Sequence, residues 1–101
     1  MMQNDLIERL FWFAVRTIKY SKLLPNLPEY SVIKYQLSKS ATSSGANYEE
    51  AQAASSRADF KNKVYIALKE MRESNYWLRI IKELIISQSE ELEILLAFMI
   101  I

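Results

Sequence analysis

The stretch QLSKSATSSGANYEEAQAASSRADF, residues 36–60, combines small side chains, a polar corner and a helix start, and it indicates how the whole chain is organised. It contains the only Gly, Gly45, and two adjacent carboxylates. Because Ser, Ala and Gly let two helix axes approach closely, the first half predicts a tightly packed helix, even though Gly inside a helix costs about 1 kcal/mol. Ser56 and Asp59 then fit a capping box, S-x-x-[DE], which predicts that a new helix begins there.

The composition predicts a single all-α domain over residues 1–101. Half of the 101 residues are apolar, and one Gly and two Pro leave few places for turns. Such a chain favours a few long helices over many short strands. The expected helices cover about 4–24, 31–53, 57–86 and 88–101, with the third helix the longest. Asn4, Ser31, Ser56 and Ser87 are the expected N-caps, and Pro25 is expected to end the first helix.

The chain contains neither Cys nor His. This excludes disulfides, thiolate nucleophiles, His general bases and nearly all zinc sites, so we expect no enzyme activity, no metal and no cofactor. No apolar run reaches the roughly 18 residues of a membrane span, and no secretory leader pattern opens the chain. The expectation is therefore a cytoplasmic protein with no membrane partner.

The first helix carries two neighbouring apolar stripes, which is more apolar surface than one neighbour needs. Two explanations remain open: a central helix in a monomer core, or a helix of which Phe11 or Trp12 faces another subunit. The last eight residues, ILLAFMII, are apolar on every side, which predicts burial in an assembly or a chain that continues. The candidate residues for an oligomer interface are Phe11, Trp12, Val15, Phe98 and Ile101.

The end of the second helix is expected to carry a polar corner formed by Asn47, Glu50, Arg57 and Arg72. We place Glu50 on the packed face of that helix, together with Val32, Tyr35, Lys39 and Ala46. The first alternative is a partly buried ion pair between Glu50 and Arg57 or Arg72. The others are an exposed pair of carboxylates at a helix end and a catalytic or metal-binding role.

Positive charge is concentrated early in the chain, although the formal net charge is only +1. Two alternatives remain: an ordinary solvated face, or a site for the RNA or DNA backbone. Two interpretations also remain for Tyr76 and Trp77: they are packing residues, or they form a platform on which bases stack. The candidate backbone contacts are Arg9, Arg16, Lys19, Lys22, Lys34 and Lys39.

Several short motifs, in order, resemble the 23S rRNA-intervening sequence protein family, also called four helix bundle proteins. They are Gln36-Leu37, Ser40-Ala41-x-Ser43, Asn47 to Ala51, Ser56-Arg57-x-Asp59-Phe60, Ala67 to Glu70, and Glu73-x-x-Tyr76-Trp77-Leu78. The resemblance covers about residues 5–95. It implies an antiparallel up-down four-helix bundle that assembles into homopentamers, and no catalytic residues. A related branch, the accessory proteins of diversity-generating retroelements, binds nucleic acid and works with a reverse transcriptase.

Two functional hypotheses follow from the sequence. The first is a non-enzymatic, homo-oligomeric scaffold that binds copies of itself or another protein. The second is a nucleic-acid-binding accessory module whose affinity depends on salt.

Overall fold

The computed structural model describes residues 5–85 and 90–98, and within them the chain forms four α-helices and no strand. They are α1 (Asp5–Ser21), α2 (Pro28–Ala51), α3 (Arg57–Leu84) and α4 (Glu90–Leu96). The all-α fold and the long third helix are therefore confirmed. The expected caps Asn4 and Ser87 lie outside the described residues, as does Ile101.

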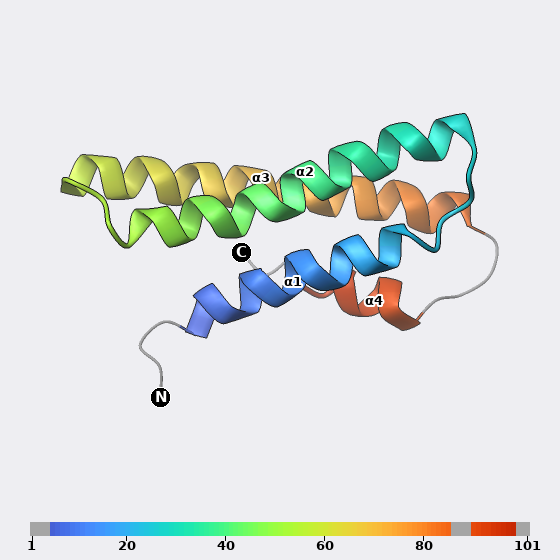
Figure 1. Cartoon of the computed structure of the whole chain (residues 1–101), viewed down its shortest axis with the longest axis horizontal. Helices are drawn as coiled ribbons and strands as arrows, with labels where there is room; N and C mark the ends of the chain where they lie inside the picture. The colour runs from blue at the N-terminus through green and yellow to red at the C-terminus, as the bar shows by residue number, and fades with distance from the viewer. Residues whose placement is uncertain (1–4, 86–89, 99–101) are drawn as a thin grey trace.

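The helices form a bundle in which α2 and α3 are a long antiparallel pair, and α1 and α4 lie beside each other along one side of it (Figure 1). The α2–α3 pair extends beyond the N-terminal end of α1. Helix α4 has only seven described residues, so it covers part of the length of the bundle.

The helix starts confirm one expected cap and correct another. Ser56 caps α3: its Oγ accepts a hydrogen bond from the Asp59 amide at 3.0 Å. The expected cap at Ser31 is wrong, because α2 begins three residues earlier, at Pro28, after an extended Leu27. Proline has a fixed φ and no N–H, which suits the first position of a helix. Ser31 therefore lies inside α2, and its hydroxyl donates to the Leu27 carbonyl at 3.4 Å.

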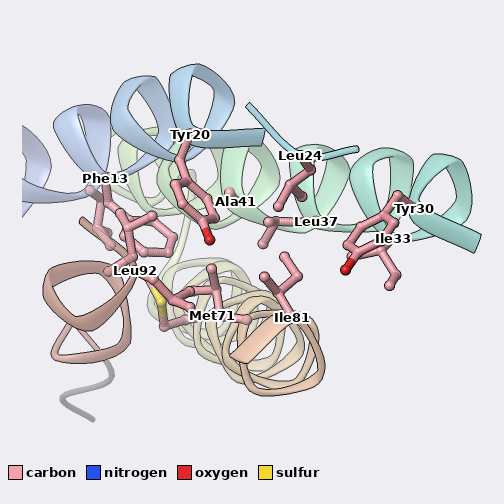
Figure 2. Packing of buried hydrophobic residues seen from close by; sticks show 13 residues of the cluster. Phe13, Tyr20, Leu24, Tyr30, Ile33, Leu37, Ala41, Met71, Ile81 and Leu92 are labelled. Atoms are coloured by element: carbon pink, nitrogen blue, oxygen red, sulfur yellow. The ribbon is translucent and has the colours of Figure 1, made fainter. Parts of the chain in front are cut away.

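The core lies between the four helices, where their apolar side chains converge (Figure 2). Helix α1 contributes the first of its two predicted stripes, which includes Leu10, Phe13 and Tyr20, and α4 contributes Leu92 and Leu95. The second stripe of α1 stays exposed or half-buried. The largest fully buried apolar side chains are Phe13, Leu37, Met71, Leu78, Ile81, Leu92 and Leu95.

The face of α2 that packs is not the one that we expected from the sequence. Val32 and Tyr35 are exposed, and so are Lys39, Ala46 and Glu50 on the same side. The buried face instead carries small residues, including Ser40 and Ser44. Hydroxyls tolerate this burial because they find partners: Ser44 Oγ donates to the Ala67 carbonyl of α3 at 3.1 Å. The same buried face carries Ile33 and Leu37 one turn apart, so its apolar half was visible in the sequence and was overlooked in favour of the neighbouring face.

Gly45 lies where α2 meets α1. A Cβ atom added to Gly45 would lie 3.4 Å from Leu10 Cβ and 3.5 Å from the Leu10 carbonyl oxygen. The backbones therefore approach so closely that a methyl group would just fit. This close approach supports the packing role that the sequence suggested for the small residues of α2.

Candidate functional site

The outward side of α1 carries a small aromatic patch, formed by Phe11, Trp12 and Val15. Phe11 and Trp12 are each 51% exposed, and Val15 beside them is half-buried. The two rings pack edge to face, with centroids 5.1 Å apart and planes at 85°. The two rings pack against each other, and about half of each side chain remains exposed to solvent. The patch is therefore available to a partner.

Phe98, another candidate for the interface, already has a partner within the subunit. Its ring centroid lies 5.1 Å from that of Phe13, and the side chain packs against the core while remaining half-buried. The interface hypothesis therefore rests on the α1 patch. Ile101 lies outside the described residues.

Arg16, a candidate for backbone binding, is occupied by an ion pair between α1 and α4. Its Nη2 lies 2.7 Å from Glu91 Oε1, and its Nε donates to Oε2 at 3.0 Å, so the contact is bidentate. The hydrogen bond with Glu91, together with the charge of that carboxylate, raises the pKa of the Arg16 guanidinium above its ordinary value. A neutralised cation contributes little to the attraction of a phosphate.

The remaining cations of that set are spread over several segments: Arg9 and Lys19 lie on α1, Lys22 in the turn after it, and Lys34 and Lys39 on α2. Lys34 on α2 is half-buried, and α1 carries the acidic Glu8 on its exposed surface. The structure therefore weakens the backbone site expected from the early positive charge. The exposed members are Arg9, Lys19, Lys22 and Lys39.

The expected polar corner does not exist as a unit. Glu50 is exposed, and its carboxylate lies 3.5 Å from Lys63 Nζ rather than beside Arg57 or Arg72, both of which are exposed. Asn47 donates to Ser43 of its own helix, to the carbonyl at 2.9 Å and to the hydroxyl at 3.1 Å. The buried ion pair predicted for Glu50 is therefore wrong, because Glu50 lies on the outer face of α2.

The apolar cavity between α1, α2 and α3 offers little chemistry. It holds about 100 Å³ and is bordered by Leu6, Tyr48, Val64 and Met71 among others. Ser44 also borders the cavity, and its hydroxyl donates a hydrogen bond to the Ala67 carbonyl. Residues 5–85 and 90–98 contain no group of three or more acidic, His or Cys residues placed to hold a metal ion. Within those residues, no helix is both long enough and apolar enough to cross a membrane.

The sequence reasoning missed a surface on the outward side of α3. Its residues recur every three or four positions, the spacing that places side chains on one side of a helix. From the sequence, Arg72 was considered as an ion-pair partner of Glu50, and Tyr76 as a packing residue or part of a stacking platform, but the charged and aromatic residues were not placed on one shared face. All members are exposed: Lys61, Tyr65, Lys69, Arg72, Tyr76 and Arg79, called here the α3 outer face.

The comparisons with known proteins match this architecture. The family model described as 23S rRNA-intervening sequence protein matches residues 2–99. The chain belongs to the 23S rRNA-intervening sequence protein family. A solved relative of this family is a protein of unknown function, from the S23 ribosomal protein family, of Bacteroides thetaiotaomicron. It is 40% identical, with a TM-score of 0.81 over 90% of this chain and 84% of that one. No curated protein matches the chain.

Proposed function

We propose that this family member is a non-enzymatic cytoplasmic scaffold that associates with copies of itself through the outward side of α1. The observation that carries the proposal is the exposure of Phe11 and Trp12, each at 51%, as a mutually packed pair. Aromatic residues are enriched at protein interfaces because they bury large areas at a low cost in side-chain entropy. Because the two rings are adjacent, they form one continuous exposed apolar area, which is the feature that distinguishes a contact surface from scattered apolar residues.

A second copy is the partner that best fits this surface. Val15 extends the apolar area along α1, while Glu8 and Lys19 supply charges of both signs at its edge. An apolar centre with a mixed polar rim is the usual anatomy of an interface. The resemblance noted from the sequence implies a ring of five copies, which is a closed cyclic assembly.

Light scattering after size-exclusion chromatography tests the proposal, at low and at high salt. We expect the wild type to have the mass of about five copies, and the assembly to persist at high salt because an apolar contact is not screened. Phe11→Glu and Trp12→Glu should each reduce the mass, since each buries an unpaired charge in the interface. Circular dichroism checks that the variants remain helical.

Tyr35→Glu is the matched control. Tyr35 is also an exposed aromatic, at 64%, but it lies on the outer face of α2. Its substitution should leave the mass unchanged. A wild type that is monomeric at every concentration would overturn the proposal, and unchanged masses for both α1 variants would overturn the role of this patch.

A further inference from the structure

The α3 outer face places four cations and two aromatic rings along one side of the helix. Lys61 and Arg79 mark its ends, eighteen residues apart, which corresponds to about 27 Å at ~1.5 Å per residue. The opposite side of α3 is buried in the core through residues such as Met71 and Leu78. The helix therefore holds the surface rigidly and turns it toward solvent.

The cations of the α3 outer face have no ion-pair partner among the described residues. The ion pairs among the described residues join Arg16 to Glu91, Lys63 to Glu50 and Lys82 to Glu93, and none of them involves the four cations of the α3 outer face. Glu83 follows one turn beyond Arg79 and marks the end of the positive stretch. Within a chain whose net charge is only +1, this face thus carries four cations that form no ion pair with the described residues.

The tyrosines on this face are presented as exposed rings. Tyr65 is 63% exposed, and it lies between Lys61 and Lys69 along the helix. The Tyr76 ring meets Trp77 edge to face, with centroids 5.0 Å apart. Trp77 is itself held by a hydrogen bond from its Nε1 to Glu73 at 3.2 Å. These contacts orient the Tyr76 ring instead of leaving it free to rotate.

The guanidinium group of Arg79 lies over the ring of Tyr76. Its guanidinium carbon lies 5.9 Å from the centroid of the Tyr76 ring, and its Nε donates to Asn75 Oδ1 at 2.9 Å. These contacts use one of the five N–H donors of the guanidinium in a hydrogen bond. The others remain for a phosphate, which arginine recognises with two parallel hydrogen bonds.

We propose that the α3 outer face binds a single-stranded nucleic acid. The four cations would contact successive phosphates, and unpaired bases would stack on the rings of Tyr65 and Tyr76. Sites of this kind combine a charged track for the backbone with aromatic side chains that accept any base. Bases in a duplex are stacked on one another, so only an unpaired strand uses both features. The inference is independent of self-association, because it concerns a different helix.

Fluorescence anisotropy of a labelled twelve-residue oligouridylate tests the proposal, with oligothymidylate of equal length as a second probe. We expect binding at low salt to both probes, because phosphates and base faces are common to them. Affinity should fall steeply with salt. For four neutralised phosphates, the logarithm of the association constant should decrease with a slope of roughly −3 against the logarithm of salt concentration. A duplex of the same length should bind at least about tenfold more weakly.

Matched variants separate this face from the charge of the molecule as a whole. Lys69→Ala with Arg72→Ala should reduce the slope to roughly half, since two phosphate contacts are lost. Lys19→Ala with Lys22→Ala removes the same charge from the end of α1 and the turn after it, and should leave the slope nearly unchanged. Tyr65→Ala should weaken binding about tenfold. Tyr65→Phe should retain binding because the ring remains, and Tyr35→Ala should have no effect.

The proposal would be overturned by any of three results. One is the absence of binding to both single strands at low salt. Another is an equal loss from the α1 and α3 charge variants, which would indicate general attraction to a cationic protein. The third is competition by polyglutamate as effective as that by oligouridylate, which would indicate a surface for acidic proteins. Circular dichroism of each variant excludes unfolding as the cause of a loss.

Discussion

Ser40 of α2 and Ser74 of α3 share a buried hydrogen bond, with their hydroxyl oxygens 2.8 Å apart. Ser40 Oγ also reaches the Leu37 carbonyl at 3.3 Å, and Ser74 Oγ reaches the Glu70 carbonyl at 3.1 Å. One hydroxyl donates to the other, and the acceptor donates in turn to its own helix. Both hydroxyls are thereby satisfied where the two longest helices pack, so the small residues of α2 provide a polar link as well as close contact.

We expect Ser74→Ala to lower the free energy of unfolding by about 1 kcal/mol, the usual net contribution of one hydrogen bond. The remaining hydroxyl of Ser40 can still donate to Leu37. In a protein that already carries Ser74→Ala, Ser40→Ala should therefore lower the free energy of unfolding by less than it does in the wild type, because the shared hydrogen bond is already lost. Urea denaturation of the two single variants and the double variant measures this coupling. Strictly additive losses would contradict it.

Gly45→Ala should preserve or raise stability. The added Cβ would meet Leu10 at 3.4 Å, an ordinary contact distance, and alanine favours the helix by up to about 1 kcal/mol over glycine. Gly45→Val should instead destabilise by about 1–3 kcal/mol, because its extra methyl groups extend into the space that Leu10 occupies. Thermal unfolding of both variants provides the measurement. A valine variant as stable as the alanine variant would show that α1 and α2 have room to separate.

Arg16→Ala should loosen α4. The bidentate contact with Glu91 connects residues that are 75 positions apart and joins the last described helix to the first. We expect faster amide hydrogen exchange within residues 90–96 and little change within α2 and α3. Lys22→Ala, which removes an exposed cation of the same region, is the control. Exchanging the charges, with Arg16→Glu and Glu91→Arg together, should restore part of the protection that Arg16→Glu alone removes.

Stability should be nearly independent of pH between about 6 and 9. The chain has no His and no Cys, the side chains that ordinarily titrate in this range. The pKa of Arg16 is raised in the folded state. Its contribution is therefore fully present below the ordinary arginine pKa and is lost only as the pH rises through the higher folded value. Melting temperatures across this range provide the test, and a fall near neutrality would contradict it.

Local chemistry predicted the helices well, because it is encoded in neighbouring residues. Ser56 and Asp59 predict the start of α3, and the structure contains that cap. Pro28 carried an equally good signal for α2, but the cap chemistry of Ser31 was preferred. The orientation of α2 was predicted wrongly: Ile33 and Leu37 mark the buried face in its first half, but in the second half that face continues only through small residues such as Ser40 and Ser44.

Contacts between distant parts of the chain could not be predicted in the same way. The pairing of Arg16 with Glu91, and of Glu50 with Lys63 in place of Arg57 or Arg72, depends on how the helices are rotated about their axes. No local pattern specifies that rotation. The α3 outer face was different: its spacing is visible in the sequence, and it was missed because its charged and aromatic members were considered separately.

The position of α4 in the bundle determines when the core can be completed during synthesis. Helices α2 and α3 are neighbours in the chain and can pair early, because closing a short connection costs little entropy. Helix α4 leaves the ribosome after the other three helices, and it must return to α1 across a long stretch of chain. Until it does so, the side of the core that Leu92 and Leu95 cover, including Phe13, remains open to water. During translation, this unfinished side is where nascent chains are most exposed to premature contact with one another.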